Sequence, residues 1–221
     1  MTRMLLSKFH IHYLLIALTL LLPLRSFAAD SSEVVVKNLI DRVSTELDKL
    51  YKAKRIGDKA ALEAMIRSEI VPHIDQQRIT QRVFRQYWSQ LTSAGKADDA
   101  QQRVINSLVR TYGVALSSYS GDTLTVVSVK EDGDKSRAIT RIRSPNGQTM
   151  QVDFALGNKG GEWLINDMAV DGIGVSLTLF NAIKPVWDQQ GMDAALNAIS
   201  QVDANPKSEA NKDKAAEPAK K

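Results

Sequence analysis

Residues 144–170 read SPNGQTMQVDFALGNKGGEWLINDMAV, and this stretch predicts two antiparallel β-strands with a turn before each. In its MQVDFAL segment every second residue is apolar, which is typical of a strand with one buried face. The preceding Asn146-Gly147 pair is a strong hairpin signal, because both residues tolerate positive φ. The NKGG segment predicts another turn, so residues 162–170 run antiparallel to the strand before them.

Two further strands precede this stretch and complete the predicted sheet. Residues 123–130 and 137–143 have strand-like sequences, and an Asp-Gly-Asp turn at 132–134 separates them. Short turns between all neighbours predict an antiparallel meander of four strands. Apolar residues occur on both sides of the first and last strands, which leaves two interpretations open: a filled core covered by helices on two sides, or an apolar cavity. The opposed sets are Leu124 and Val126 against Val127 and Val129, and Trp163 and Ile165 against Leu164, Met168 and Val170.

Helical periodicity dominates the chain before and after the strands. Apolar residues recur every three to four positions, and glycine, proline or aspartate marks the breaks. Asp58, Asp75 and Ser176 are predicted N-caps, and Pro185 is expected to kink or interrupt its helix. Helices segregated from an antiparallel meander indicate an α+β fold, with about six or seven helices around the sheet. The predicted helices cover residues 32–56, 59–72, 76–87, 98–119, 176–189 and 192–202.

The two ends of the chain differ from the part between them. Arg3 and Lys8 precede an apolar run at 13–22, and small residues follow it, as in a secretory signal peptide. The run is too short to span a bilayer. The last residues of the chain contain charge, alanine and proline but no large apolar side chain, which is typical of disorder. We therefore expect a signal peptide at 1–28, a single domain at 29–202 and a disordered charged tail at 203–221.

Composition excludes several classes of function. Loss of Arg3, Lys8 and Arg25 with the signal peptide lowers the formal net charge from +4 to +1, so nothing indicates a nucleic-acid-binding protein. The chain has no cysteine and therefore no disulfide, and His73 is the only histidine after the signal peptide. A metal site built from cysteine or from several histidines is excluded, and no serine occupies a nucleophile elbow that His73 would serve.

Three aspartates and one glycine-rich segment remain as candidates for chemistry. Asp153 and Asp167, on neighbouring strands, are available for acid–base catalysis or cation binding. Both alternate with apolar residues, as solvated strand positions do, and Asp171 stands before a glycine, as in an ordinary turn. The GIGVSL segment at 172–177 fails the dinucleotide-binding fingerprint, because its sixth residue is leucine and no βαβ unit surrounds it. The pattern therefore assigns no catalytic or metal-binding residue.

Five segments carry a family resemblance through their order and spacing, although none of them is a catalytic signature. They are IVPHID at 70–75, FRQYWSQLTSAGK at 84–96, LVRTYGVALSSYSGDTLTV at 108–126, SPNGQTMQVDFAL at 144–156 and EWLINDMAVDGIGVSL at 162–177. Together they resemble the MlaC family of periplasmic phospholipid-binding proteins, also called the toluene-tolerance auxiliary family. The resemblance runs from residue 34 to residue 201.

The resemblance implies a soluble periplasmic carrier, not an enzyme, that encloses phospholipid acyl chains between the sheet and the helices. It implies a monomer with no cofactor apart from its phospholipid cargo and no nucleic-acid partner. Lipid exchange with an outer-membrane lipoprotein–porin complex, and with an inner-membrane ABC transporter and its substrate-binding ring, would maintain outer-membrane lipid asymmetry. The matching positions expected to line the pocket are Tyr87, Trp88, Leu108, Tyr112, Val152, Phe154, Met168, Val170, Ile173, Val175, Leu177 and Phe180.

Two other functions remain open at this point. A periplasmic chaperone, or a carrier of another apolar ligand, would also use an apolar cleft, and a small hydrolase or isomerase would use carboxylates such as Asp153 and Asp167. The carrier fits the missing catalytic cluster. An acyl chain needs only a dry apolar channel, worth about 0.8 kcal/mol for each buried CH₂, while its head group stays in water.

Overall fold

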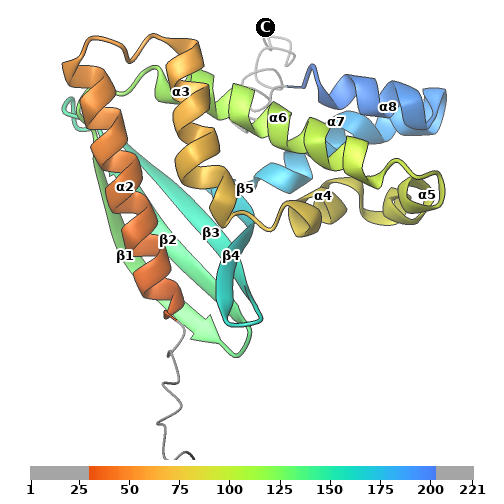
Figure 1. Cartoon of the computed structure of the whole chain (residues 1–221), viewed down its shortest axis with the longest axis horizontal. Helices are drawn as coiled ribbons and strands as arrows, with labels where there is room; N and C mark the ends of the chain where they lie inside the picture. Colours follow the sequence, from red (N-terminus) through yellow and green to blue (C-terminus); the bar gives the residue numbers. More distant parts are fainter. Residues whose placement is uncertain (1–29, 203–221) are drawn as a thin grey trace, which may run out of the picture.

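An antiparallel sheet forms one wall of the molecule, and helices from both ends of the chain pack against it (Figure 1). The structure is a computed structural model, and it describes residues 30–202. The predicted signal peptide and charged tail lie outside these residues. Within them, no helix is long and apolar enough to cross a bilayer. The α+β fold expected from the sequence is confirmed.

The elements follow one another as a helical block, a sheet and a second helical block. The first block comprises α2 (Ser32–Lys52), α3 (Lys59–Met65), the π-helical turn η2 (Ile66–Ile70), the 3₁₀ turn η3 (Val71–His73), α4 (Gln76–Phe84), the 3₁₀ turn η4 (Arg85–Tyr87), α5 (Trp88–Ser93) and α6 (Ala97–Leu116). The strands are β1 (Thr123–Asp132), β2 (Lys135–Arg143), β3 (Thr149–Lys159), β4 (Glu162–Val170) and β5 (Ile173–Gly174). The chain closes with α7 (Val175–Gln190) and α8 (Met192–Ile199).

The strands pair in sequence order, each antiparallel to the next, so the predicted meander is confirmed. The predicted number of strands is one too low, because the two-residue strand β5 adds to the edge of β4 by pairing Ile173 with Val170. Asp171 and Gly172 join these strands in a tight turn, both at positive φ (47° and 84°), as a type I′ turn requires. Two residues carry no periodicity, so the pattern could not predict this strand.

Two β-bulges gather the apolar residues of the sheet on one face. Val127 is the extra residue in β1 and Asn166 is the extra residue in β4. Because a bulge shifts the alternation by one residue, Val129 returns to the face of the apolar residues before it, and Met168 returns to the face of Ile165. The sequence predicted apolar residues on both faces of β1 and β4. This prediction is corrected, because most of these residues lie on the helix-facing side.

Side-chain caps begin the early helices where the sequence predicts them. Asp58 accepts a hydrogen bond from the N–H of Ala61 at 3.1 Å and so begins α3. Asp75 accepts one from the N–H of Arg78 at 2.9 Å and begins α4. Each cap pairs an N–H that the helix itself leaves unsatisfied, which is worth about 1 kcal/mol.

Helix α7 begins on a carboxylate of the neighbouring strand, so the predicted cap at Ser176 is wrong. Ser176 lies inside the helix, and its N–H and hydroxyl both donate to the Asp167 carboxylate, at 3.3 and 2.6 Å. The negative charge is favourable at a helix N-terminus. The predicted interruption at Pro185 is also absent, because α7 continues to Gln190.

Buried apolar side chains fill the space among α4, α5, α6, α7 and α8. Phe84, Leu91, Val104 and Ile183 are fully buried there, and the Phe84 ring packs edge-on against Trp187, with 6.1 Å between ring centroids. In Figure 1 these helices extend to one side of the sheet, whereas α2 and α3 lie in front of it. Side chains of α2 and of the sheet enclose a cavity, which is the candidate site.

Candidate functional site

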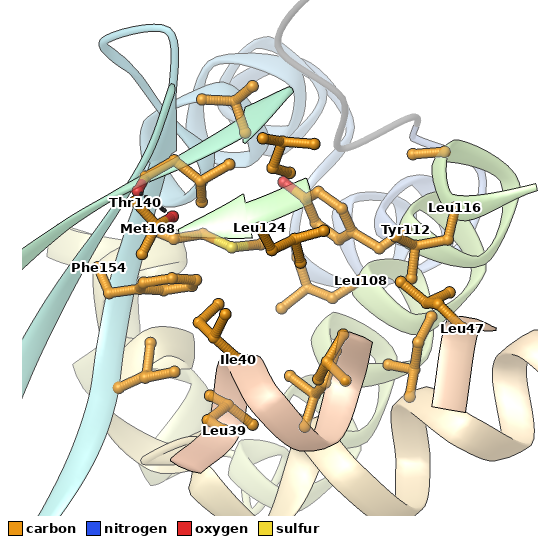
Figure 2. Close-up of a pocket in the computed structure, with 18 of the residues that line it drawn as sticks. Leu39, Ile40, Leu47, Leu108, Tyr112, Leu116, Leu124, Thr140, Phe154 and Met168 are labelled. Atoms are coloured by element: carbon orange, nitrogen blue, oxygen red, sulfur yellow. Dashed lines mark hydrogen bonds between the residues drawn. The ribbon is translucent and has the colours of Figure 1, made fainter. Parts of the chain in front are cut away.

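A cavity of about 400 Å³ lies between the apolar face of the sheet and helices α2 and α6. Its volume falls in the range of small-molecule sites, roughly 300–1,000 Å³. Figure 2 shows Phe154, Ile40 and Leu108 directed toward this space from the sheet, α2 and α6. The lining residues are Leu39, Ile40, Val43, Leu47, Ile66, Ile70, Val71, Ile74, Ile79, Ile105, Leu108, Val109, Tyr112, Ala115, Leu116, Ser118, Tyr119, Asp122, Leu124, Thr140, Ile142, Met150, Val152, Phe154, Ile165, Met168 and Val170.

Helices α2 and α6 each contribute one apolar stripe to the wall. Residues three to four positions apart share a face of a helix, so the residues of each stripe line the cavity together. The α2 stripe was not predicted to line a pocket, because the same periodicity is typical of a helix packed on a filled core. The stripes are Leu39, Ile40, Val43 and Leu47 on α2, and Ile105, Leu108, Val109, Tyr112 and Leu116 on α6.

The bulge at Asn166 decides which part of β4 lines the cavity. Ile165 lies before the bulge and Met168 and Val170 lie after it, and all three face the cavity. An unbroken strand would point Ile165 away from the other two. Trp163 and Met168, which an unbroken strand would place on opposite faces, therefore lie on the same face of β4.

The polar groups of the lining are mostly engaged within the protein. The Thr140 hydroxyl donates to the Val152 carbonyl at 2.7 Å. The Tyr119 hydroxyl donates to the Asp48 carboxylate at 2.5 Å, and burial together with this carboxylate raises the pKa of Tyr119. Because these hydroxyls already have hydrogen-bond partners, a ligand does not need to bond with them. The cavity surface therefore behaves as an apolar one.

The most exposed part of the lining lies beyond the C-terminus of α6. Ser118 is the exposed member of the lining, and Asp122 is half-buried. Asp122 is also the one lining residue with a formal charge at neutral pH. These two residues therefore form a polar, partly solvated part of an otherwise mostly apolar lining.

Six of the twelve sequence-predicted site residues line this cavity. They come from α6 and from strands β3 and β4, whose register pairs Val152 with Val170 and Phe154 with Met168. Whether they contact lipid stays a prediction. The six are Leu108, Tyr112, Val152, Phe154, Met168 and Val170.

The other six predicted residues do not line this cavity, and whether they contact lipid stays a prediction. Tyr87 stacks on Trp187 with 4.5 Å between ring centroids, in an aromatic cluster that includes Phe180. Val175 is fully buried, whereas Ile173 and Leu177 are 40% and 41% exposed. Trp88 packs half-buried against the helical core. Apolar character alone could not separate these core and surface positions from cavity positions.

The Tyr87 cluster also carries a small polar network at its edge. The Tyr87 hydroxyl donates to Asp188 at 2.5 Å, and Lys184 donates to the same carboxylate. The bond to Lys184, followed by the bond to Tyr87, lowers the pKa of Asp188, whereas the bond to Asp188 raises the pKa of Tyr87. This network ties α7 to η4 and lies outside the cavity.

The titratable residues singled out by sequence do not face the cavity. Asp153 is bound by Arg137 at 2.5 Å and by Gln151 at 2.8 Å on the opposite face of the sheet, and Asp167 begins α7. Arg42 contacts the ring Nε2 of His73, and burial, followed by this guanidinium, lowers the pKa of His73. Among residues 30–202, no group of three or more His, Cys, Asp or Glu side chains is placed to hold a metal ion.

Comparison with known proteins shows the family of this chain. The family model for MlaC protein matches residues 37–201, which is most of the chain. The chain belongs to the MlaC family. The resemblance seen in the five sequence segments is thus confirmed, over nearly the range expected from them.

Two curated relatives match most of the chain. "Toluene tolerance protein ttg2D" of Pseudomonas putida is 24% identical over 180 residues, covering 81% of this chain and 83% of the relative. "Intermembrane phospholipid transport system binding protein MlaC" of Haemophilus influenzae is 26% identical over 198 residues, covering 86% of this chain and 90% of the relative. The chain therefore spans nearly the whole of both relatives.

A solved structure shares the fold. The phospholipid-binding protein from Ralstonia solanacearum, determined in complex with a phospholipid, superimposes with a TM-score of 0.70 at 20% sequence identity. The match covers 78% of this chain and 96% of that one. At this identity the likeness concerns the fold alone.

Proposed function

We infer that this protein is a periplasmic phospholipid carrier whose cavity encloses acyl chains. The observation that carries the inference is the apolar cavity of about 400 Å³ in a chain of the MlaC family. The names of two relatives support it, since one is called an intermembrane phospholipid transport binding protein and the other a toluene tolerance protein. The phospholipid bound by the Ralstonia protein of the same fold adds further support.

Acyl chains fit the chemistry of the wall. Each buried CH₂ contributes about 0.8 kcal/mol, and no hydrogen bond needs to be made along the chain. Leu39, Leu47 and Leu108 are 3%, 0% and 5% exposed, so a chain between them is removed from water. The head group lies at the Ser118 and Asp122 end, where the lining meets solvent.

The carrier works between two membranes. Residues 1–28 direct the chain to the periplasm and are removed there. The protein then takes phospholipid from an outer-membrane lipoprotein–porin complex and delivers it to an inner-membrane ABC transporter, which maintains the lipid asymmetry of the outer membrane. This role requires no catalytic group, which accords with Asp153 and Asp167 being occupied by arginine, glutamine and serine partners on the far side of the sheet.

The decisive experiment identifies the cargo. The full chain is expressed with its leader in a Gram-negative host, purified from the periplasm without detergent and examined by native mass spectrometry, followed by solvent extraction and lipid analysis. We expect phospholipid at a stoichiometric level in a folded, monodisperse sample. A folded sample that carries an apolar peptide instead would support the chaperone alternative, and a sample with neither ligand would contradict the carrier.

A further inference from the structure

A second hollow, of about 480 Å³, lies on the other side of the sheet, between α4 and the ends of β2 and β3. We call it the basic groove. It shares no lining residue with the apolar cavity, and its walls are polar. Its lining residues are Asp75, Gln77, Arg78, Gln81, Arg82, Asp134, Lys135, Ser136, Ala155, Leu156, Gly157, Asn158, Lys159 and Asn166.

Cations stand on both walls of the basic groove. Arg78 and Arg82 are one turn apart on α4 and both exposed, so they share the face that forms one wall. Lys135 and Lys159 come from the facing ends of β2 and β3. Of these four, only Arg82 approaches a carboxylate within residues 30–202, namely that of Asp167 at 3.8 Å.

The acidic residues near the basic groove balance only part of its positive charge. Asp75 and Asp134 belong to its lining, and the carboxylate of Asp75 also accepts the N–H of Arg78 as the cap of α4. Asp167 adds a third carboxylate beside Arg82. Four cations against these three acids leave a net positive charge in a concave site, and such a site concentrates field on an anionic ligand.

Asn166 adds a polar group to the basic groove. The bulge in β4 turns its side chain away from the cavity and into the basic groove. Its Nδ2 lies 3.0 Å from where a Cβ would stand on residue 157, so Gly157 is the residue that admits the amide. Its Oδ1 is buried and has no hydrogen-bond partner among residues 30–202, so the Nδ2 is the atom of this amide that a ligand in the groove meets.

We propose that the basic groove docks an acidic segment of a partner protein. Carboxylates of the segment pair with Arg78 and Arg82 on one side and with Lys135 and Lys159 on the other, and the Nδ2 of Asn166 donates to a carbonyl of its backbone. A membrane surface fits less well, because membrane-binding faces present exposed apolar residues, whereas Leu156 in the groove is 1% exposed. The proposal concerns a docking site and does not depend on what the apolar cavity holds.

The test uses the full purified chain and a short fluorescein-labelled peptide of glutamate and glycine, followed by fluorescence anisotropy. Its uncharged counterpart has glutamine in place of glutamate. We expect the acidic peptide to bind and the glutamine peptide not to bind. Arg78→Gln combined with Lys135→Gln weakens binding about tenfold, because two charge-assisted contacts are lost. Asn166→Ala weakens it severalfold without changing the net charge.

A matched control removes two charges elsewhere on the same face of the sheet. Arg141→Gln combined with Arg143→Gln acts at the opposite end of β2, about 20 Å from Lys135 along the strand, which exceeds a screening length of about 8–10 Å. We expect less than a twofold effect. Equal weakening by both pairs, or no effect of Asn166→Ala, would overturn the proposal. Binding of anionic phosphatidylglycerol vesicles with the same variant dependence, and no peptide binding, would overturn it in favour of a membrane surface.

Circular dichroism and urea unfolding of each variant establish that it is folded. None of the proposed side chains except Arg82, which is left unchanged, forms an ion pair with residues 30–202. The variants therefore test docking without removing an internal contact of the protein.

Discussion

Ile165 and Met168 lie on the same face of β4, although an odd separation would place them on opposite faces of a regular strand. The extra residue between them, Asn166, restores the alternation. As a result Asn166 points into the basic groove, while Ile165 and Met168 both build the apolar wall. The same local irregularity thus shapes both the candidate lipid cavity and the groove behind it.

A charge placed in the apolar wall should expel the cargo. Met168→Arg and Val152→Arg each bring an unpaired guanidinium into a space whose lining is apolar, and burying such a charge without a partner is costly. We expect the phospholipid signal in native mass spectra to fall at least tenfold while unfolding remains cooperative. Leu177→Arg is the control, because Leu177 is 41% exposed and outside the cavity. Unchanged occupancy in the Met168 variant would mean that lipid lies elsewhere.

A reversed charge at Asp122 should change which head groups are held. Asp122 is the charged lining residue at the solvent end, so it attracts the ammonium of an ethanolamine head group and repels an anionic one. We expect Asp122→Lys to raise the ratio of phosphatidylglycerol to phosphatidylethanolamine in the extracted lipid. Asp132→Lys, at the exposed far end of β1, makes the same charge change and should leave the ratio as it is. A ratio that moves equally in both variants would place the head group elsewhere.

Removal of the Tyr119 hydroxyl should loosen the contact between α2 and the segment that follows α6. The hydroxyl donates to Asp48 at 2.5 Å, and Tyr119 is 6% exposed. Tyr119→Phe deletes this bond and leaves Asp48, half-exposed on α2, to water. We expect a loss of about 1 kcal/mol in the free energy of unfolding, measured in urea. A loss below the error of the measurement would show that this bond contributes no net stability.

Asp167 should behave as a structural residue rather than as a catalytic one. Asp167→Ala removes the acceptor for the N–H and hydroxyl of Ser176 and leaves α7 without its cap. We expect a loss of about 1–2 kcal/mol in unfolding free energy, with lipid occupancy retained. Asp153→Ala, on the same face, serves as the comparison for a carboxylate that begins no helix. If Asp167→Ala instead left stability unchanged, the assignment of its carboxylate as the cap of α7 would be wrong.

Stability should fall with acidification through His73. Burial and the guanidinium of Arg42 lower its pKa below the ordinary value of 6.5, so the unfolded chain binds this proton more readily than the folded chain does. Above pH 6.5 protonation of His73 therefore does not reduce the free energy of unfolding. This free energy falls as the pH drops from 6.5 toward the lower pKa of the folded state. Chemical unfolding of the wild type and of His73→Asn between these limits measures the effect. The variant should lose less stability on acidification, and parallel curves would contradict the assignment.

Much of the sheet follows from local sequence, because turn chemistry and alternation act between near neighbours. The Asn146-Gly147 pair and the alternation of the third strand are sufficient to predict β2, β3 and their antiparallel order. Asp58 and Asp75 likewise reveal helix starts, since a cap contacts a residue only three positions away. The order and spacing of the same segments were sufficient to indicate the family.

The candidate site could be predicted only in part. Leu108, Val152 and Met168 were predicted as pocket residues and line the cavity, whereas Leu47 and the rest of the α2 stripe were not predicted, and Tyr87 and Phe180 do not line it. An apolar stripe has the same periodicity whether a filled core or a cavity faces it. What distinguishes them is the distance between elements that lie far apart in the chain, and no local pattern encodes that distance.

By itself the sequence determined the meander, most helix starts, the absence of cysteine chemistry and the family. Tertiary structure decided which way Asn166 and Val127 break their strands, because a bulge is defined by the partner strand and not by the residue. It also decided that Asp167 caps a helix that begins eight residues later. Above all, it decided that α2 stands far enough from the sheet to leave a cavity, since that separation results from the packing of the whole chain.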